Sequence, residues 1–516
     1  MVLPPKSDHP LGDQALSTRN PLSEAVEVDT YAGKLHVEWD STAKVTPMGQ
    51  LPFFIQFLKL GGRFDPWVSD CPLHYRSNNA PKKVNVLGSL FLSILSGHNR
   101  YAHITNLMSD QVNSRLLGMT KVVSDDSARR GLSKIDEKAG IEWLQKHLQS
   151  CYEPLLTTPW ILDVDVTVKP LYGHQEGAKK GYNPQKPGRP SHTYHTYMMG
   201  NLRLVLDVEV QSGDQSNSCH SMPGLISLLH RLPVNGKPAF VRGDIAWGTD
   251  NAMTQLEAIF QHYLFKLKKS INVKNLIYKH HALGEWIYIN KEWEAKEDQL
   301  QLQGWKKERR VVIVRRRLSS DNIIGFETQN QLQQQLALID GPEDIRAYEY
   351  SVLVTDLEDD IVTIFQHYRD RADCENNFDE LKNQWGWGGY TTHKIKSCQF
   401  MARMIALVCN WWNLFVRLAI PHKHHEAITS RPLLLSSIGR LTEHGRQKKM
   451  LITSTHGNIT TLKSAYTRLI GFFDELKTTA TQLNYSECWS LILAKAMEKF
   501  KVNLGSDNYI GLPAPS

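Results

Sequence analysis

Apolar positions recur with a helical period through the first third of the chain, and the period changes to two near Trp160. Residues 1–45 are polar and dotted with proline, which predicts a flexible arm, and helical patterns follow through 46–150. In the run W-I-L-D-V-D-V-T-V, apolar residues alternate with Asp163 and Asp165. This alternation predicts a strand with one apolar face and one polar face.

A mixed α/β sheet is predicted for residues 151–265, because strand patterns there are separated by a helical one. Two strand patterns at 191–199 and 202–210 are joined by a tight turn. A helical pattern follows at 221–231. The run A-F-V-R-G-D at 239–244 is then a fourth strand that ends at an acid.

A β-rich insertion is predicted at 266–355, where short apolar runs alternate with polar connections. The runs are N-L-I-Y-K-H, E-W-I-Y-I, R-V-V-I-V-R and E-Y-S-V-L-V. The sheet region should resume at 356–420 with a long helix around Glu375, and 421–516 is expected to be helical and basic. The predicted fold class is therefore α/β: a mixed sheet flanked by helices and interrupted by a β-rich insertion, with helical N- and C-terminal regions.

Composition narrows the class of protein. The 516 residues are 41% hydrophobic and 22% charged, which is typical of a globular protein of several domains. The net charge of +7 favours a polyanionic partner. Seven scattered cysteines argue against a disulfide framework and for a reducing compartment. There is no apolar signal core, and the most apolar window, 401–421, contains arginine and asparagine, so we expect a buried helix and a cytoplasmic protein without a membrane span.

The run Y-R-D-R-A-D-C-E-N-N-F-D-E-L-K carries an unusual combination of side chains for one helix. The residues that recur there at spacings of three and four, and would share one stripe, are Tyr368, Arg371, Glu375, Phe378 and Lys382. A stripe that faces the core would carry leucine, isoleucine or valine. An acid between two cations suits a metal ion and an anionic substrate. A solvated face with ion pairs is the alternative.

Two further carboxylates have settings that suit a metal site. Asp165 lies on the polar face of its strand, and Asp244 ends a strand, where open α/β sheets bind ligands. With Glu375, three carboxylates from separate elements could hold two Mg²⁺ or Mn²⁺ ions, because oxygen ligands favour these metals over zinc. Two such ions would activate a water or a 3′-hydroxyl against a phosphodiester. Asp163 shares the face of Asp165 and is the alternative first ligand.

These motifs resemble those of bacterial insertion-sequence transposases of the DDE class, in the cut-and-paste group marked by a Tyr-x2-Arg-x3-Glu-x6-Lys (YREK) signature. The four residues within 368–382 match that spacing in full, and Asp165 and Asp244 match the first and second acids. The loop 171–192 also resembles a block from one branch of the group. Matches extend from about residue 86 to about residue 475, which is most of the chain.

The resemblance implies an RNase H-like sheet, interrupted by the insertion between the second acid and the glutamate. It implies that Asp165, Asp244 and Glu375 are catalytic and bind Mg²⁺, for cleavage at transposon-end inverted repeats and transfer of the 3′ ends into target DNA. A homodimer would act on the paired ends, often through hairpin-ended DNA, in association with the bacterial nucleoid. The residues expected to contact phosphates near the cut are Tyr368, Arg371 and Lys382.

Three basic segments are candidate DNA-binding surfaces. The helix after the predicted N-cap Ser124 carries Arg129 and Arg130, and could be the second helix of a helix-turn-helix or an ordinary surface helix. The loop 171–190 could follow a phosphate backbone or be merely solvated. Its cations are Lys179, Lys180, Lys186 and Arg189.

The densest basic run, at 305–317, combines an aromatic ring with many cations and suits stacking on a distorted base. Its members include Trp305, Lys306, Lys307, Arg309, Arg310, Arg315, Arg316 and Arg317. Trp286 and Trp293 are further candidates for such a wedge, although tryptophan in a β-rich region is usually core.

Two other functions compete with this interpretation. A domesticated, non-catalytic DNA-binding protein would keep the fold and its surfaces. A glycosidase with paired carboxylates is disfavoured, because it has no need for arginine and lysine beside the acid. The run P-H-K-H-H lacks the helical spacing of metal ligands, so His422, His424 and His425 are expected to be surface residues.

Overall fold

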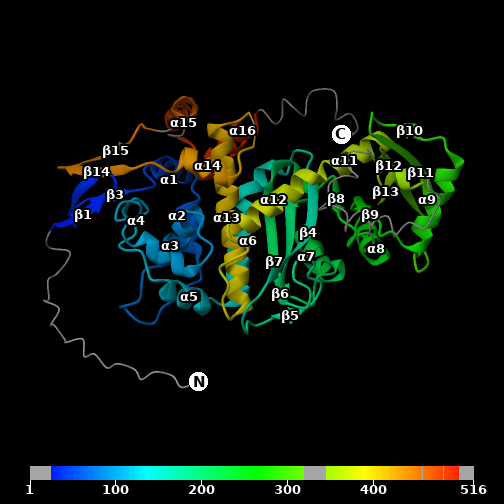
Figure 1. Cartoon of the computed structure of the whole chain (residues 1–516), viewed down its shortest axis with the longest axis horizontal. Coiled ribbons are helices and arrows are strands. Elements are labelled where there is room, and N and C mark those ends of the chain that lie inside the picture. Colours follow the sequence, from blue (N-terminus) through cyan, green and yellow to red (C-terminus); the bar gives the residue numbers. More distant parts are fainter. Residues whose placement is uncertain (1–24, 319–344, 423, 456, 480–481, 499–516) are drawn as a thin grey trace, which may run out of the picture.

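A large mixed sheet runs through the computed structural model, with helices packed along it (Figure 1). The structure describes residues 25–318, 345–422, 424–455, 457–479 and 482–498. The strand order is β10-β11-β12-β13-β9-β8-β4-β6-β5, with β7 also paired to β6. The predicted mixed α/β fold is confirmed at this level.

The centre of the sheet contains the four predicted strands, seen as β4, β6, β7 and β8, together with two short strands, β5 and β9, that the sequence did not predict. The strands are β4 (Ile161–Pro170), β5 (Lys179–Lys180), β6 (Pro190–Met199), β7 (Leu204–Ser212), β8 (Phe240–Gly243) and β9 (Tyr263–Lys266). β4, β6 and β7 pair antiparallel, whereas β8 pairs parallel to both β4 and β9. The helices that follow these strands are α7 (Ser218–Arg231), α8 (Asp250–Glu257), α11 (Ile361–Arg369), α12 (Arg371–Asn383) and α13 (Ile395–Ala419).

The segment predicted as a β-rich insertion extends this same sheet. Its elements are α9 (Ile271–Leu283), β10 (Ile287–Tyr288), β11 (Trp293–Leu300), β12 (Arg309–Arg317) and β13 (Tyr348–Thr355). β13 pairs antiparallel with β9, with Leu353 opposite Lys266, so no break separates the two halves. One prediction was wrong: N-L-I-Y-K-H lies inside the helix α9 and not in a strand.

The helix α13 lies in the core of the molecule. Almost all of its 25 residues are buried, as predicted for the apolar window at 401–421. Its Asn410 side chain accepts from the Val205 backbone N–H (2.9 Å) and donates to the Val205 carbonyl (2.7 Å), so it satisfies the open edge of β7. Within the described part of the chain, no helix is long and apolar enough to cross a membrane.

The N-terminal region is mainly helical. Its elements are β1 (Val26–Thr30), β2 (Gly33–Val37), β3 (Val45–Thr46), α1 (Leu51–Leu60), α2 (Phe64–Asp70), α3 (Lys83–Leu95), α4 (Asn113–Leu116), α5 (Asp125–Lys134) and α6 (Glu137–Tyr152). Of the arm predicted at 1–45, residues 1–24 lie outside the described residues, and β1 and β2 form an exposed hairpin.

The C-terminal region combines helices with a hairpin that the sequence did not predict. Its elements are α14 (Ala427–Leu434), β14 (Gly439–His444), β15 (Gln447–Ile452), α15 (Ile459–Thr479) and α16 (Tyr485–Ala496). β3 adds a third strand to this hairpin, and rings of α1 pack on α13 and α16, as in the pairs Phe54–Phe415 (5.2 Å) and Phe57–Trp489 (5.6 Å). The two ends of the described chain therefore share one core.

Candidate active site

The middle of β4 and the end of β8 bring the first two acids together. β4 and β8 run parallel, and their last paired residues are Val164 and Gly243. The next residue on each strand is an aspartate, Asp165 on β4 and Asp244 after β8. Because adjacent strands lie about 4.8 Å apart, these two aspartates lie side by side.

Asp163, the alternative first ligand, is engaged elsewhere. Arg242 on β8 donates to both of its carboxylate oxygens, at 2.5 and 2.7 Å, and these two side chains are 2% and 1% exposed. Arg242 also donates to the backbone carbonyl of His367 on α11. This buried ion pair ties the sheet to the helix. A charged residue inside the apolar run A-F-V-R-G-D was the signal that could have revealed it.

The helix α12 supplies the third acid and a cation. Its Arg371 guanidinium lies between two carboxylates, 3.2 Å from Asp165 Oδ1 and 2.5 Å from Glu375 Oε1. The Arg371 side chain is only 8% exposed, whereas Glu375 is 64% exposed. Arg371 therefore links the strand acid to the helix acid.

The charges of this cluster act on one another. Burial raises the pKa of Asp165 to about 6; Arg371 opposes that rise, and the carboxylates of Asp244 and Glu375 add to it. Burial also raises the pKa of the Tyr368 phenol to about 12, so this group stays protonated and can donate a hydrogen bond at neutral pH. Three acids, one arginine and one tyrosine thus share a single electrostatic environment.

The donor set of this cluster fits a hard divalent cation. Asp165, Asp244 and Glu375 offer only carboxylate oxygens, as Mg²⁺ and Mn²⁺ require. As the side chains stand, no group of three or more His, Cys, Asp or Glu residues in the described ranges is close enough to hold an ion. Arg371 lies between two of the acids instead, and the exposed Glu375 has room to change rotamer.

A packed turn fixes the position of Asp244. The Asp244 Oδ1 atom accepts from the Ala246 backbone N–H at 2.9 Å, and its carbonyl accepts from the Trp247 N–H at 3.1 Å. Trp247 is buried and lies beneath Gly243, where an added Cβ would come within 2.7 Å of the indole. Glycine before the acid is therefore required by the close approach of Trp247.

The predicted stripe is divided between two helices. α11 ends at Arg369 and α12 begins at Arg371, so Tyr368 lies on one helix and the remaining stripe residues on the other. Phe378 is buried in the core. The expectation of one continuous helix was wrong in this respect, although Tyr368 still lies within electrostatic reach of Arg371.

The far end of α12 meets the basic loop at 171–190. The Lys382 ammonium lies 3.4 Å from Gln185 Oε1 in that loop. Within the loop, Lys186 and Arg189 stack on the exposed ring of Tyr172, at 4.9 and 4.7 Å from its centroid. Sequence reasoning missed Tyr172. Of the other loop cations, Lys179 pairs with Asp214 at 3.1 Å and Lys180 is exposed.

The basic run at 305–317 is largely neutralised inside the sheet. Its pairs with acids are Arg309–Asp250 and Arg309–Glu257, Lys307–Glu257, Arg310–Glu297, Arg315–Glu294 and Arg316–Glu349. Trp286, Trp293 and Trp305 are partly buried, and each has an arginine over its ring. Five of the seven cations in this run therefore already have a carboxylate partner, and these are Lys307, Arg309, Arg310, Arg315 and Arg316. Its role in DNA binding, with Arg317 exposed at the end of β12, stays a prediction.

The helix predicted to bind DNA begins as expected. Ser124 caps α5 by accepting from the Ser127 N–H at 3.3 Å. Arg129 pairs with Asp125 and Asp126, both at 2.8 Å, while Arg130 is exposed. The preceding helix α4 has only four residues. A helix-turn-helix role for this segment stays a prediction.

His424 is not a plain surface residue. Its Nε2 lies 3.1 Å from Glu380 Oε2, and the backbone N–H of Ala427 and the indole of Trp385 donate to the other oxygen of the same carboxylate. Glu380 is buried, and these partners hold its pKa below the usual range although burial opposes them. His424 thus joins α12 to the start of α14.

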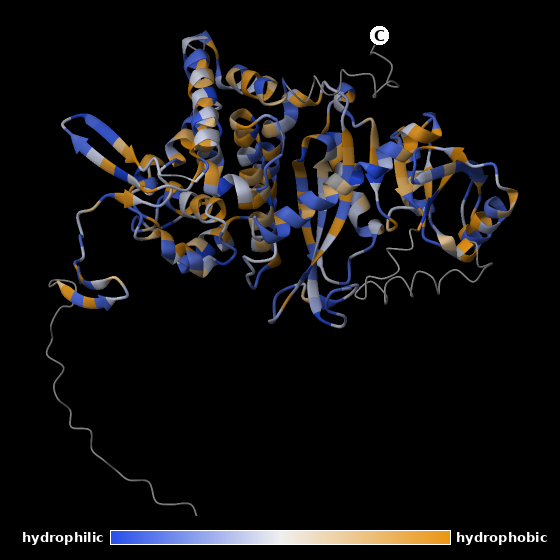
Figure 2. Ribbon diagram, turned by 45° about the horizontal axis from the view of Figure 1, so that its top comes forward, coloured by the Kyte–Doolittle hydropathy of each residue, from blue (hydrophilic) through white to orange (hydrophobic). Residues whose placement is uncertain are grey.

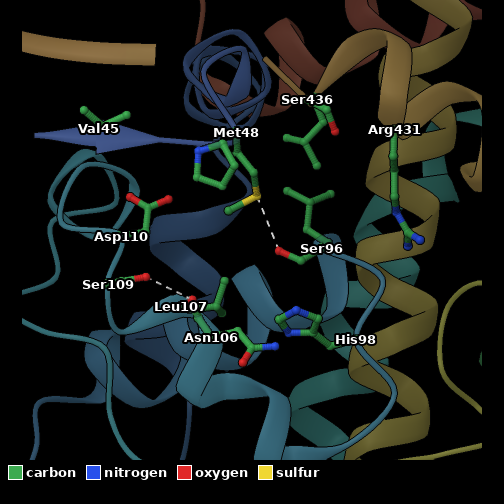
Figure 3. Close-up of a pocket in the computed structure, with 13 residues that line it drawn as sticks. Val45, Met48, Ser96, His98, Asn106, Leu107, Ser109, Asp110, Arg431 and Ser436 are labelled. Atoms are coloured by element: carbon green, nitrogen blue, oxygen red, sulfur yellow. Dashed lines mark hydrogen bonds between the residues drawn. The ribbon is translucent and has the colours of Figure 1, made fainter. Parts of the chain in front are cut away.

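A cavity of about 310 Å³ lies away from the carboxylates, where β3, α3 and α14 meet (Figure 3). Asp110 on its wall accepts from Thr46, Asn113 and two backbone N–H groups. Arg431 donates to the carbonyls of Gln384 and Ile94. The polar groups of Asp110 and Arg431 are therefore engaged in hydrogen bonds within the protein. None of the residues predicted for the active site lines this cavity.

Comparison with known proteins points to one family. A family model described as "Transposase DDE domain group 1" matches residues 75–471. No curated protein sequence gives a significant match. A cryo-EM structure of a piggyBac transposase synaptic complex with hairpin DNA is similar to this chain at 11% sequence identity, with a TM-score of 0.35 over 92% of this chain and 90% of that one. Because the family model spans well over half of the 516 residues, the chain belongs to the DDE transposase family of domain group 1.

Proposed function

We propose that this DDE transposase binds the inverted repeats at the ends of a transposon, cleaves the DNA there and joins the 3′ ends to target DNA. Asp165, Asp244 and Glu375 are the catalytic acids of this proposal. The observation that carries it is the meeting of three elements: the middle of β4 and the end of the parallel strand β8 place Asp165 beside Asp244, and Arg371 links Asp165 to Glu375.

The three acids would hold two Mg²⁺ or Mn²⁺ ions. When bound, such ions activate an attacking water or 3′-hydroxyl and stabilise the leaving oxygen of the phosphodiester. Asp165 is well suited to hold a cation, because burial and two neighbouring carboxylates disfavour its negative charge. Glu375 is exposed and can turn toward the ions without disturbing the core.

Arg371, Tyr368 and Lys382 would bind the DNA around the cut. Arg371 is a permanent cation with a planar set of donors, which suits two phosphate oxygens. Tyr368 keeps its proton at neutral pH and can donate a hydrogen bond to a third phosphate oxygen. Lys382 lies next to the loop at 171–190, so its ammonium and the loop cations Lys180, Lys186 and Arg189 would follow the backbone away from the site.

We further propose that the sheet is RNase H-like and that the protein acts as a homodimer on paired ends. The strand order β7-β6-β4-β8-β9 supports the first point, with antiparallel pairing up to β4 and parallel pairing after it. The first acid then lies on the central strand and the second at the end of its parallel neighbour. Hairpin-ended intermediates and association with the nucleoid belong to the same proposal.

Nicking of a plasmid that carries the DNA flanking the gene tests the catalytic role. Asp244→Asn and Glu375→Gln should each abolish Mg²⁺-dependent nicking and leave binding of the flanking DNA largely intact. Asp379→Asn is the matched control, because Asp379 is an exposed acid on the same helix as Glu375. Nicking that survives both active-site changes would exclude these residues as the catalytic acids.

A non-catalytic, domesticated DNA-binding protein is the second candidate. One observation favours it: Arg371 already neutralises two of the three acids in the arrangement described. That protein would bind the same DNA but give no nicking in the unaltered chain, at any Mg²⁺ or Mn²⁺ concentration. The plasmid assay therefore separates the two candidates.

A further inference from the structure

The hairpin of β14 and β15 projects from the helical region at the left of Figure 1, and its outer part is mostly hydrophilic (Figure 2). β3 pairs only with its base, at Gly439 and Arg440. Gly445 and Arg446 form the turn, and Gly445 has a φ of +59°, as the first residue of a type II′ hairpin turn requires. Beyond the base, the two strands pair with each other.

The two faces of this hairpin differ. On the inner face, Leu441 is buried and Glu443 lies 3.1 Å from the Lys44 ammonium. On the outer face, Arg440 and Lys449 are exposed, with Leu451 opposite Arg440 and Thr442 opposite Lys449. The hairpin carries four cations and a single acid. The cations are Arg440, Arg446, Lys448 and Lys449.

The cations of the hairpin lack the partners that neutralise β12. Lys448 lies opposite Glu443, which already pairs with Lys44. Arg440 contributes to lowering the pKa of the Asp40 carboxyl by charge attraction. Arg446 and Lys449 make no ion pair with any residue in the described ranges. On β12, by contrast, Arg309, Arg310, Arg315 and Arg316 each contact a carboxylate within 3 Å. These cations of β12 are neutralised by carboxylates of the same chain, whereas Arg446 and Lys449 of the hairpin are available to an external anion.

We propose that this hairpin is a basic wing that lies against the sugar-phosphate backbone of duplex DNA. The identity of the partner rests on the proposed function. Each strand has six residues, about 20 Å in length, which is enough to cross a groove about 12 Å wide. Cations that meet phosphates release condensed counterions, which makes the contact favourable and sensitive to salt. Such contacts position the duplex and do not read its sequence.

The salt dependence of DNA binding tests this wing. Fluorescence anisotropy on short duplexes of two unrelated sequences, from about 50 to about 200 mM salt, gives the slope of log K against log salt. In Arg446→Ala/Lys449→Ala the slope should fall by about 2 on both duplexes, by about 1 for each lost phosphate contact. Lys138→Ala/Lys477→Ala is the matched control and should keep the slope of the unaltered chain. Lys138 on α6 and Lys477 on α15 are exposed lysines away from the hairpin.

The outcomes separate the wing from the proposed function. An equal slope in both double variants and in the unaltered chain would overturn the proposal that the hairpin contacts the DNA backbone. A change of slope on one duplex only would mean sequence readout, which the wing excludes. A loss of self-association in sedimentation for the hairpin variant alone would make the hairpin a subunit contact instead. If the unaltered chain bound neither these duplexes nor the DNA flanking the gene, the proposed function itself would fail. Thermal unfolding should coincide for all three proteins, because the substituted side chains are exposed.

Discussion

Asp163 and Asp165 lie two residues apart on the same face of β4, yet their surroundings give them different roles. Asp163 is 1% exposed and held by two hydrogen bonds from Arg242. Asp165 is 21% exposed and forms an ion pair with Arg371 from the helix α12. The first is a structural acid and the second faces the site.

Neutralising these two aspartates should therefore affect stability differently. Asp163→Asn leaves the buried Arg242 without a counter-charge and should lower the free energy of unfolding by about 3–5 kcal/mol. Asp165→Asn removes a negative charge that burial already disfavours, so it should change the free energy of unfolding far less. Urea unfolding of the two variants without divalent metal measures the difference. Equal losses would show that Asp165 is also a structural acid.

The sequence could not choose between these two aspartates. Strand alternation places both on one face, and the residue that decides between them, Arg242, lies 79 positions away. The spacing of Arg371 and Glu375 did predict their contact on one helix. The bridge from Arg371 to Asp165 joins residues 206 positions apart, so only the folded sheet reveals it.

At the scale of elements, the turn after β8 sets the position of Asp244. Gly243→Ala would place a methyl group 2.7 Å from the Trp247 indole, so the turn must shift. We expect a loss of about 1–3 kcal/mol in unfolding free energy and a large loss of nicking. Thermal unfolding and the plasmid assay measure the two effects.

Gly471→Ala is the control for this change. Gly471 lies inside α15 with nothing within 4 Å of an added Cβ, so alanine there should stabilise the protein by about 0.5–1 kcal/mol. If Gly243→Ala also left stability and nicking unchanged, Trp247 would not fix the acid.

Helices and strands were predictable where the period was long enough to identify them. The run N-L-I-Y-K-H alone is too short to distinguish a strand from a helix. Over the whole of α9, the buried residues Val273, Leu276, Ile277 and His280 follow the spacing of a helical face. The continuation of the sheet from β9 to β13 depends on pairing across more than eighty residues, which no local pattern encodes.

At the scale of the whole molecule, segments from both ends of the described chain complete one another. Val45 and Thr46 add a strand to the hairpin at 439–452, and α1 packs on α13 and α16. The core of the sheet also contains a buried titratable group. His195 in β6 is fully buried, between Ser221 Oγ and Thr193 Oγ1.

Acidification should destabilise the fold through such histidines. Burial lowers the pKa of His195 to about 4, below the value of about 6.5 in an unfolded chain. The unfolded chain therefore takes up a proton first, and stability is lost as the pH falls from about 6.5 to about 4. The contribution of this group is about 1.4 kcal/mol per pH unit in that window. Urea unfolding at several pH values should give His195→Gln a shallower slope than the unaltered protein. Identical slopes would mean that His195 does not titrate in this range.

The central claim is that Asp165, Asp244 and Glu375 converge on shared cations, and anomalous diffraction from crystals soaked in Mn²⁺ tests it most directly. We predict that Arg371 leaves its place between the acids and that manganese peaks lie about 2.0–2.2 Å from carboxylate oxygens of all three residues. The same peaks should vanish in Asp244→Asn. Manganese bound only elsewhere, or no manganese while Arg371 stays between Asp165 and Glu375, would contradict the assignment.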